Sequence, residues 1–164
     1  MRTTTRVSAV LAAFLSLGAM PAVAQSANIN AVANLFQAIT VTGARDLDFG
    51  NVFPGVAKPI AVAAATSGRF DLTGQSSAPV QVAFTLPATL ISGANTLPIG
   101  SWTGCTSPTT SAAGCTAFTP SGTATSTAFS GAGALSVFVG ATVTPAAAQA
   151  AGSYTGTVVL TANY

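Results

Sequence analysis

The chain has 164 residues, enough for one domain of ordinary size, and it carries only five basic and three acidic residues. It contains no histidine and no glutamate, so the commonest general acids and bases and the commonest metal ligand are missing. The few Lys and Arg residues cannot form the basic cluster that nucleic-acid binding requires. The composition therefore argues against an enzyme, a cofactor or metal site and a nucleic-acid partner.

Residues 1–24 have the three parts of a secretory signal peptide. Arg2 and Arg6 supply the positive start, residues 7–20 form a short apolar run, and residues 22–24 read Ala-Val-Ala. A membrane anchor is the alternative, but fourteen helical residues extend only about 21 Å, less than a hydrocarbon core of about 30 Å. We expect cleavage after residue 24, export, and no membrane span in the remaining chain.

Residues 25–164 lack the pattern of a long amphipathic helix and instead show short segments of period-two alternation, separated by Gly, Pro and Ser. This pattern predicts an all-β sandwich or barrel. An alanine-rich stretch, residues 146–151, is confined by Pro145 and Gly152 and reads as a connection. In chain order the expected strands are Asn28–Phe36, Gln37–Thr42, Leu47–Asn51, Ile60–Ala64, Gly68–Thr73, Val80–Leu86, Thr96–Trp102, Thr123–Phe129, Leu135–Thr144 and Tyr154–Asn163.

The last two expected strands have clean apolar faces, which predicts one side on a core and the other in water. On the strand that begins at Leu135, the side opposite the apolar one holds Ser136, Gly140 and Thr142. On the final strand, one face carries Tyr154, Gly156, Val158, Leu160, Ala162 and Tyr164.

Charge is scarce and localised. In residues 25–164 three cations and three anions remain, and all six lie between Arg45 and Asp71. Zero net charge favours association over repulsion. A protein that sits in an assembly fits this pattern, and so does a small secreted domain that its many Ser and Thr hydroxyls keep soluble.

Cys105 and Cys115 allow a single pairing, and in an exported protein we expect them to form a disulfide that holds a surface loop. Trp102, the only tryptophan, lies close by and is a candidate contact surface, although a packed tryptophan is the more common case. Asp46 and Asp48 resemble a fragment of a calcium loop, but the further acids of such a loop are absent, so a solvated turn is the better interpretation.

Three stretches carry a family resemblance: DLDFGNVFPG at 46–55, GRFDLTG at 68–74 and AGSYTGTVVLTANY at 151–164. Together they resemble a family of secreted bacterial proteins catalogued as a domain of unknown function, similar to the spore coat protein U type of pilin subunit. Pilins of this type place a glycine and a tyrosine twelve residues apart on the last strand, the spacing of Gly152 and Tyr164.

The resemblance implies an immunoglobulin-like, pilin-like β-sandwich, residues 37–164, that lacks one strand. A neighbouring subunit would supply that strand from its N-terminal extension, residues 25–36, and build a fimbria or surface fibre for adhesion, biofilm or surface coating. It further implies a periplasmic chaperone, an outer-membrane usher, a Gram-negative source and a position at the cell surface after transit through the periplasm.

The extension itself fits this role. Residues 25–36 have no charge, Pro or Gly, and when extended they place alternate apolar residues on one face: Ala27, Ile29, Ala31, Ala33 and Leu35. The same alternation suits an ordinary first strand within its own domain. The alternative function is a self-contained, monomeric secreted binding domain that uses the surface around Trp102.

Overall fold

The computed structural model describes residues 25–164, so the expected signal peptide, residues 1–24, lies outside the described part. The chain divides into two units, which meet between Asn34 and Leu35. In the first unit, residues 25–34 form neither helix nor strand and their side chains are exposed.

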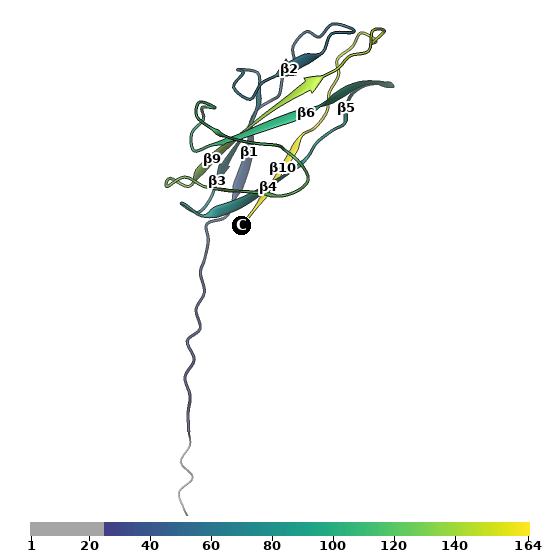
Figure 1. Cartoon of the computed structure of the whole chain (residues 1–164). Helices are drawn as coiled ribbons and strands as arrows, with labels where there is room; N and C mark the ends of the chain where they lie inside the picture. The colour runs from purple at the N-terminus through teal and green to yellow at the C-terminus, as the bar shows by residue number, and fades with distance from the viewer. Residues whose placement is uncertain (1–24) are drawn as a thin grey trace, which may run out of the picture. The chain divides into compact units, whose positions relative to one another are not determined.

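The second unit, Leu35–Tyr164, is all-β, and its described residues contain no helix (Figure 1). All strand pairs are antiparallel. The strands are β1 (Thr40–Arg45), β2 (Lys58–Ile60), β3 (Gly68–Thr73), β4 (Pro79–Thr85), β5 (Thr89–Ser92), β6 (Asn95–Ser107), β7 (Thr116–Phe118), β8 (Thr125–Ala128), β9 (Ala134–Val143) and β10 (Val159–Asn163).

The strands form two sheets. The larger has the order β1-β3-β9-β6-β5, with β2 added to β9 and β7 added to β6, and the smaller has the order β10-β4-β8. A shared apolar core holds the sheets together. Its first cluster joins β3 and β9 of the larger sheet to β4 and β10 of the smaller one: Leu72, Val80, Val82, Phe84, Phe129, Leu135, Val137, Val139 and Leu160. The arrangement confirms the expected all-β, sandwich-like fold.

Alternation explains why these segments form strands. On β4, Val80, Val82 and Phe84 are buried, whereas Gln81 and Thr85 between and after them are exposed. Each buried Val or Phe contributes about 1.5–3 kcal/mol by leaving water. The burial of alternate residues therefore sets which face of the strand meets the core.

The sequence predicted that one side of β9 faces water. This prediction is wrong for most of the strand, because β9 is central and covered on both faces. Ser136 is 5% exposed and donates a hydrogen bond to Asp71. Gly140 is buried under the segment after β2, where a Cβ atom would meet the carbonyl oxygen of Ile60.

A β-bulge on β6 decides where Trp102 points. The register against β9 shifts between Gly100 and Thr103, and Ser101 lies there at a φ of 49°. The extra residue turns Ser101 to solvent and brings Trp102 onto the core side, where it packs against both apolar clusters.

Several expected strands differ from the structure. The expected strand Ile60–Ala64 is wrong apart from Ile60, which ends β2, and the expected strand Gln37–Thr42 begins three residues before β1. Residues 28–36 form no strand, because no neighbouring strand pairs with them. Residues 47–51 form a turn instead, in which Asp48 Oδ1 accepts a hydrogen bond from the N–H of Gly50 at 2.7 Å. The last strand begins only at Val159, and the preceding residues touch β5 through one isolated bridge, Thr155 to Ile91.

Two short strands, β5 and β7, were not expected from the sequence. β5 forms a hairpin with β6 through the two-residue turn Gly93–Ala94, with Gly93 at a φ of 58°. Two-residue hairpin turns require such a positive φ, which glycine adopts without strain. The alanine-rich stretch 146–151 is a connection between β9 and β10, as expected.

Candidate functional site

Each sheet has an edge strand beside the same side of the sandwich, β1 in the larger sheet and β10 in the smaller one, whereas β5 and β8 lie at the other ends of the two strand orders. β1 pairs only with β3, and β10 pairs only with β4. The edge of a strand presents a row of free backbone N–H and C=O groups that another strand can join. Near the C-terminus the two edges are tied together, because Tyr164 Oη donates a hydrogen bond to the carbonyl of Gln37 at 2.5 Å.

Further from the C-terminus the space between these edges is open. One hollow of about 460 Å³ has Gly43 and Arg45 of β1 on one wall and residues 154–158 on the other. A second hollow of about 670 Å³ lies between residues 47–54 and residues 149–154.

The two hollows are neighbours, because both are lined by the same four apolar or aromatic side chains: Leu47, Phe49, Leu90 and Tyr154. Further apolar side chains from the larger sheet line one hollow or the other: Leu97, Ile99, Val139 and Val143. We call the whole feature the acceptor groove. Apolar side chains form its floor, and polar residues, Arg45, Asp46 and Asp48 among them, line it as well.

Hydrogen bonds hold one wall of the groove in place. The side-chain amide of Gln149 donates to Tyr154 Oη at 2.7 Å and to the carbonyl of Thr96 at 3.0 Å. Tyr154 Oη in turn donates to the carbonyl of Ala150 at 2.8 Å. The aromatic ring of Tyr154 packs on the second core cluster, so the wall is anchored at both its polar and its apolar parts.

The residues of the expected C-terminal motif are divided between the groove and the core. Gly152 and Tyr154 line the larger hollow, and Val158 lines the smaller one. Leu160 is buried at 7% exposure in the first core cluster. Tyr164 lies beyond the groove and contacts the start of the domain.

The segment directly after β1 forms the opposite wall of the groove. Asp46 and Asp48 point to solvent while Leu47 and Phe49 point inward, so the alternation expected for a strand is present without a strand partner. Asp48 stabilises this turn, as described above, which is the role that the sequence favoured over a calcium loop. In residues 25–164 no group of three or more His, Cys, Asp or Glu side chains could hold a metal ion.

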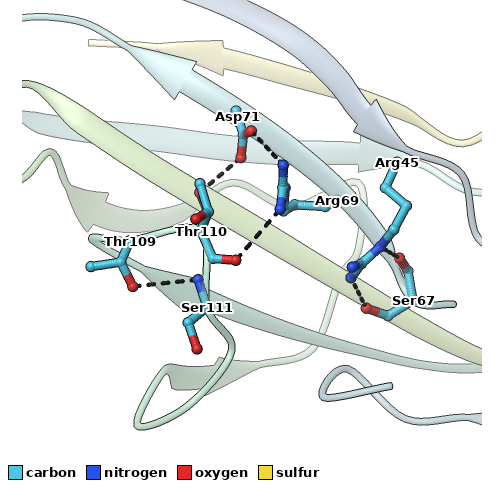
Figure 2. Close-up of polar contacts among 8 residues, drawn as sticks. Arg45, Ser67, Arg69, Asp71, Thr109, Thr110 and Ser111 are labelled. Carbon is cyan, nitrogen blue, oxygen red and sulfur yellow. Dashed lines mark hydrogen bonds and ion pairs between the residues drawn. The ribbon is translucent and has the colours of Figure 1, made fainter. Parts of the chain in front are cut away.

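Two of the charged side chains that line the groove, Asp48 and Arg45, are hydrogen-bonded to the protein itself. Figure 2 shows Arg45, at the end of β1, donating from Nε to the carbonyl of Ser67 at 2.6 Å and from Nη2 to Ser67 Oγ at 2.7 Å. Ser67 is fully buried, so Arg45 is fixed against the loop that precedes β3. The Arg45 guanidinium therefore holds the end of β1, which is part of the groove wall, in a fixed position.

The other charged pair lies outside the groove lining, on β3. Arg69 Nη2 is 3.1 Å from Asp71 Oδ2, and Arg69 Nη1 donates to the carbonyl of Thr110 at 3.4 Å (Figure 2). Ser136 Oγ donates to Asp71 Oδ1 at 2.8 Å. This network ties β3, β9 and the loop after β6 together.

The disulfide closes the same loop. Cys105, at the end of β6, is bonded to Cys115, just before β7, as the sequence predicted. Trp102 is half-buried and packs against both clusters, which favours the packing role that the sequence analysis weighed against a contact surface.

The apolar face expected on the N-terminal extension is exposed in the described chain. Ile29 is 94% and Leu35 is 98% exposed, and Ala27, Ala31 and Ala33 are exposed too. Exposed large apolar side chains in a row are typical of a surface that another molecule covers.

Sequence reasoning missed Leu90 and Leu97 as groove residues. Leu90 lies on the unexpected strand β5, and the signal that could have located it is the turn sequence Ser92-Gly93-Ala94-Asn95 between two apolar segments.

The fold and the groove define a class: a small antiparallel β-sandwich in which one edge strand of each sheet, β1 and β10, lies beside a groove with apolar side chains in its lining. Within that class, the chain belongs to the family described as Domain of unknown function (DUF4402), whose model matches residues 39–164. No curated protein matches the chain. Among the described residues there is no helix that is both long and apolar enough to cross a membrane.

Proposed function

We propose that this protein is a non-enzymatic structural subunit of an extracellular fimbria or surface fibre, which polymerises by β-strand donation. The domain is then an immunoglobulin-like, pilin-like sandwich with one strand missing. The observation that supports the proposal is the acceptor groove, because it combines apolar lining side chains with the free edges of β1 and β10. Residues 25–36 of a second copy fill it.

The extension, residues 25–36, has the backbone and side-chain groups that a strand in this groove needs. As a strand it would supply backbone N–H and C=O groups to the free edges, and it would place Ile29 and Leu35 among the groove side chains. Burying each of these two large side chains contributes about 1.5–3 kcal/mol. Because residues 25–36 carry no charge, the strand brings no charged side chain into the channel.

The proposal includes export of the protein from the cytoplasm. The disulfide between Cys105 and Cys115 is compatible with an extracytoplasmic protein, since disulfides persist in oxidising compartments. The sequence of residues 1–24 supports secretion through a signal peptide. The polymer at the cell surface would then serve adhesion, biofilm cohesion or coating.

The first test is a gel of protein sheared from the native cell surface, run in SDS with and without boiling. We expect a ladder of multiples that collapses to one band on boiling, because strand-exchanged subunits resist SDS until they unfold. Deletion of residues 25–36 removes the ladder. A single monomer band under both conditions would contradict the proposal and point to a monomeric binding domain.

A pair of point variants separates the two faces of the extension. Ile29→Lys places a charge on the face that enters the groove, and Asn30→Lys places the same charge on the opposite face. We expect Ile29→Lys to abolish the ladder and Asn30→Lys to retain it. Equal behaviour of the two variants would contradict insertion of an alternating strand.

A further inference from the structure

The smaller hollow of the acceptor groove contains free space directly beside Gly43 of β1. Three glycines line this hollow: Gly43, Gly68 and Gly156. A Cβ atom at Gly68 would lie 3.3 Å from Leu47 Cβ. One at Gly156 would lie 2.7 Å from Leu90 Cδ2. At Gly43 a Cβ atom would meet no described residue within 4 Å apart from its chain neighbours, so this position alone of the three has room for a side chain.

The pairing of β1 with β3 shows that position 43 faces the hollow. Gly43 is paired with Phe70, and Val41, two residues earlier, is paired with Leu72. Directly opposed residues of an antiparallel pair project to the same face. Leu72 is buried in the first core cluster, and Phe70 packs against that cluster and lines the smaller hollow. A side chain at position 43 would therefore project into the hollow beside Phe70.

The backbone gives no reason for a glycine at this position. The described glycines with a positive φ are Gly50, Gly55, Gly93, Gly114 and Gly133, and Gly43 is not among them. The register of β1 shifts just after Gly43, but the extra residue of that bulge is Ala44. Glycine weakens a strand, and without a turn or bulge to explain it, it is typical of a place that another chain approaches closely.

We infer that Gly43 determines which side chain the groove accepts, and that the space beside it takes Ile29 of a second copy of this chain. The inference rests on the proposed function and deepens it, because it names the residue that sets specificity. The groove face of the extension has two large side chains, Ile29 and Leu35, and its other three members are alanines. An alanine would leave most of the space empty, so a large side chain fits it better.

The start of the domain favours Ile29 over Leu35 as the occupant. The ring centroids of Phe36 and Tyr164 are 5.1 Å apart, and the carbonyl of Gln37 accepts the hydrogen bond from Tyr164 Oη. Phe36 and Gln37 thus stay on the donor domain, and Leu35 lies directly beside them in the chain. Ile29 precedes Leu35 by six residues, which span about 20 Å when extended. It can therefore reach the hollow while the donor domain remains outside the groove.

The test moves volume from one member of the contact to the other in the full chain. Gly43→Leu fills the space that we assign to Ile29, and we expect it to lower the fraction of SDS-resistant polymer about tenfold or more. Ile29→Ala leaves a cavity and should make the polymer dissociate faster. The double variant Gly43→Leu with Ile29→Ala conserves volume, so it should restore the ladder.

Gly100→Leu is the matched control. Gly100 lies on β6, lines neither hollow, and has no described residue within 4 Å of an added Cβ atom apart from its chain neighbours. We expect Gly100→Leu to keep the wild-type ladder. If circular dichroism shows that Gly43→Leu does not fold, Gly43→Val, with and without Ile29→Ala, decides by the same criteria.

A mixing experiment separates the acceptance of a strand from its donation. The Gly43→Leu chain keeps its own extension, so it can donate a strand to a wild-type groove but cannot receive one. Co-expressed with the wild type, it should therefore end the polymers that it joins and shorten the ladder. A ladder of wild-type length in the mixture would overturn the role of Gly43 in acceptance.

The outcomes also separate this inference from the proposed function. A normal ladder from the Gly43→Leu protein alone overturns the inference and leaves strand donation standing. Failure of Ile29→Ala to restore the ladder overturns the assignment to Ile29, and restoration by Leu35→Ala in its place assigns the space to Leu35. Absence of a ladder in the wild type overturns both the inference and the proposed function.

Discussion

Tyr164 Oη accepts a hydrogen bond from the backbone N–H of Gln75 at 2.7 Å, although the two residues are 89 positions apart. The same oxygen donates to the carbonyl of Gln37, and the ring packs against Phe36 and Phe129. The last side chain of the sequence thus fixes the point at which the N-terminal extension leaves the domain.

Tyr164→Phe should lower the free energy of unfolding by about 1–2 kcal/mol, because it removes two hydrogen bonds and keeps the ring. Urea unfolding followed by Trp102 fluorescence measures the change. Tyr164→Ala should cost more, since the ring contacts with Phe36 and Phe129 disappear as well. Equal stability of the Phe variant and the wild type would show that water replaces both bonds without loss.

Two glycines on neighbouring strands should respond differently to alanine. At Gly140 a Cβ atom would meet the carbonyl oxygen of Ile60 and lie 2.7 Å from Thr103 Oγ1, whereas at Gly100 it would meet nothing within 4 Å. We expect Gly140→Ala to destabilise the domain by about 1–3 kcal/mol through overpacking. Gly100→Ala is the matched control and should stay close to the wild type in thermal unfolding. A Gly140→Ala protein as stable as this control would contradict the close crossing of the segment after β2.

Asp71→Ala should destabilise the domain by about 1–2 kcal/mol, because it removes the ion pair with Arg69 and the hydrogen bond from the buried Ser136. Asp46 is exposed and serves as the control, since Asp46→Ala removes the same charge at the surface. Chemical denaturation of both variants in low and high salt measures the difference. If the two substitutions lower the free energy of unfolding equally, the contacts of Asp71 add no stability beyond the effect of a carboxylate charge.

Loss of the disulfide should lower stability by about 3 kcal/mol in the chain-entropy model, in which the bridge restricts the unfolded chain. The variant is Cys105→Ser with Cys115→Ser, and calorimetry or denaturant unfolding provides the value. A thiol reductant should bring the wild type to the stability of this variant and leave the variant itself unchanged. If the reductant also lowers the stability of the variant, the stability loss has a cause other than the disulfide.

The strands that the sequence predicted well are those with strong alternation and a partner on at least one side. Gly68–Thr73 matches β3, and the expected strands over β4 and β9 differ from the structure by one residue at each end. Alternation reports which side chains share a face, but it carries no information about whether a neighbouring strand exists. Residues 28–36 and 47–51 alternate in the same way and form no ladder, because no strand lies beside them.

The acceptor groove could not be predicted from local patterns for a related reason. It brings together Leu47, Leu90 and Tyr154 from three segments far apart in the chain. It lies beside the edge strands β1 and β10, and which strands are edges appears only when the order of strands in both sheets is known. What the sequence could predict was the alternation in residues 25–36 and a final strand, although it placed that strand at Tyr154–Asn163 and the structure starts it at Val159.

The crowding of charge into one short stretch has a consequence for digestion by enzymes that cut after lysine or arginine. In residues 25–164 their only targets are Arg45, Lys58 and Arg69. Both arginines are bound by side chains or carbonyls of the fold, and Lys58 precedes a proline. The exposed extension offers no cut site, and neither does anything after Arg69. A trypsin-like protease should therefore leave the folded subunit intact, and a tryptic digest of the denatured protein should release residues 70–164 as one large fragment.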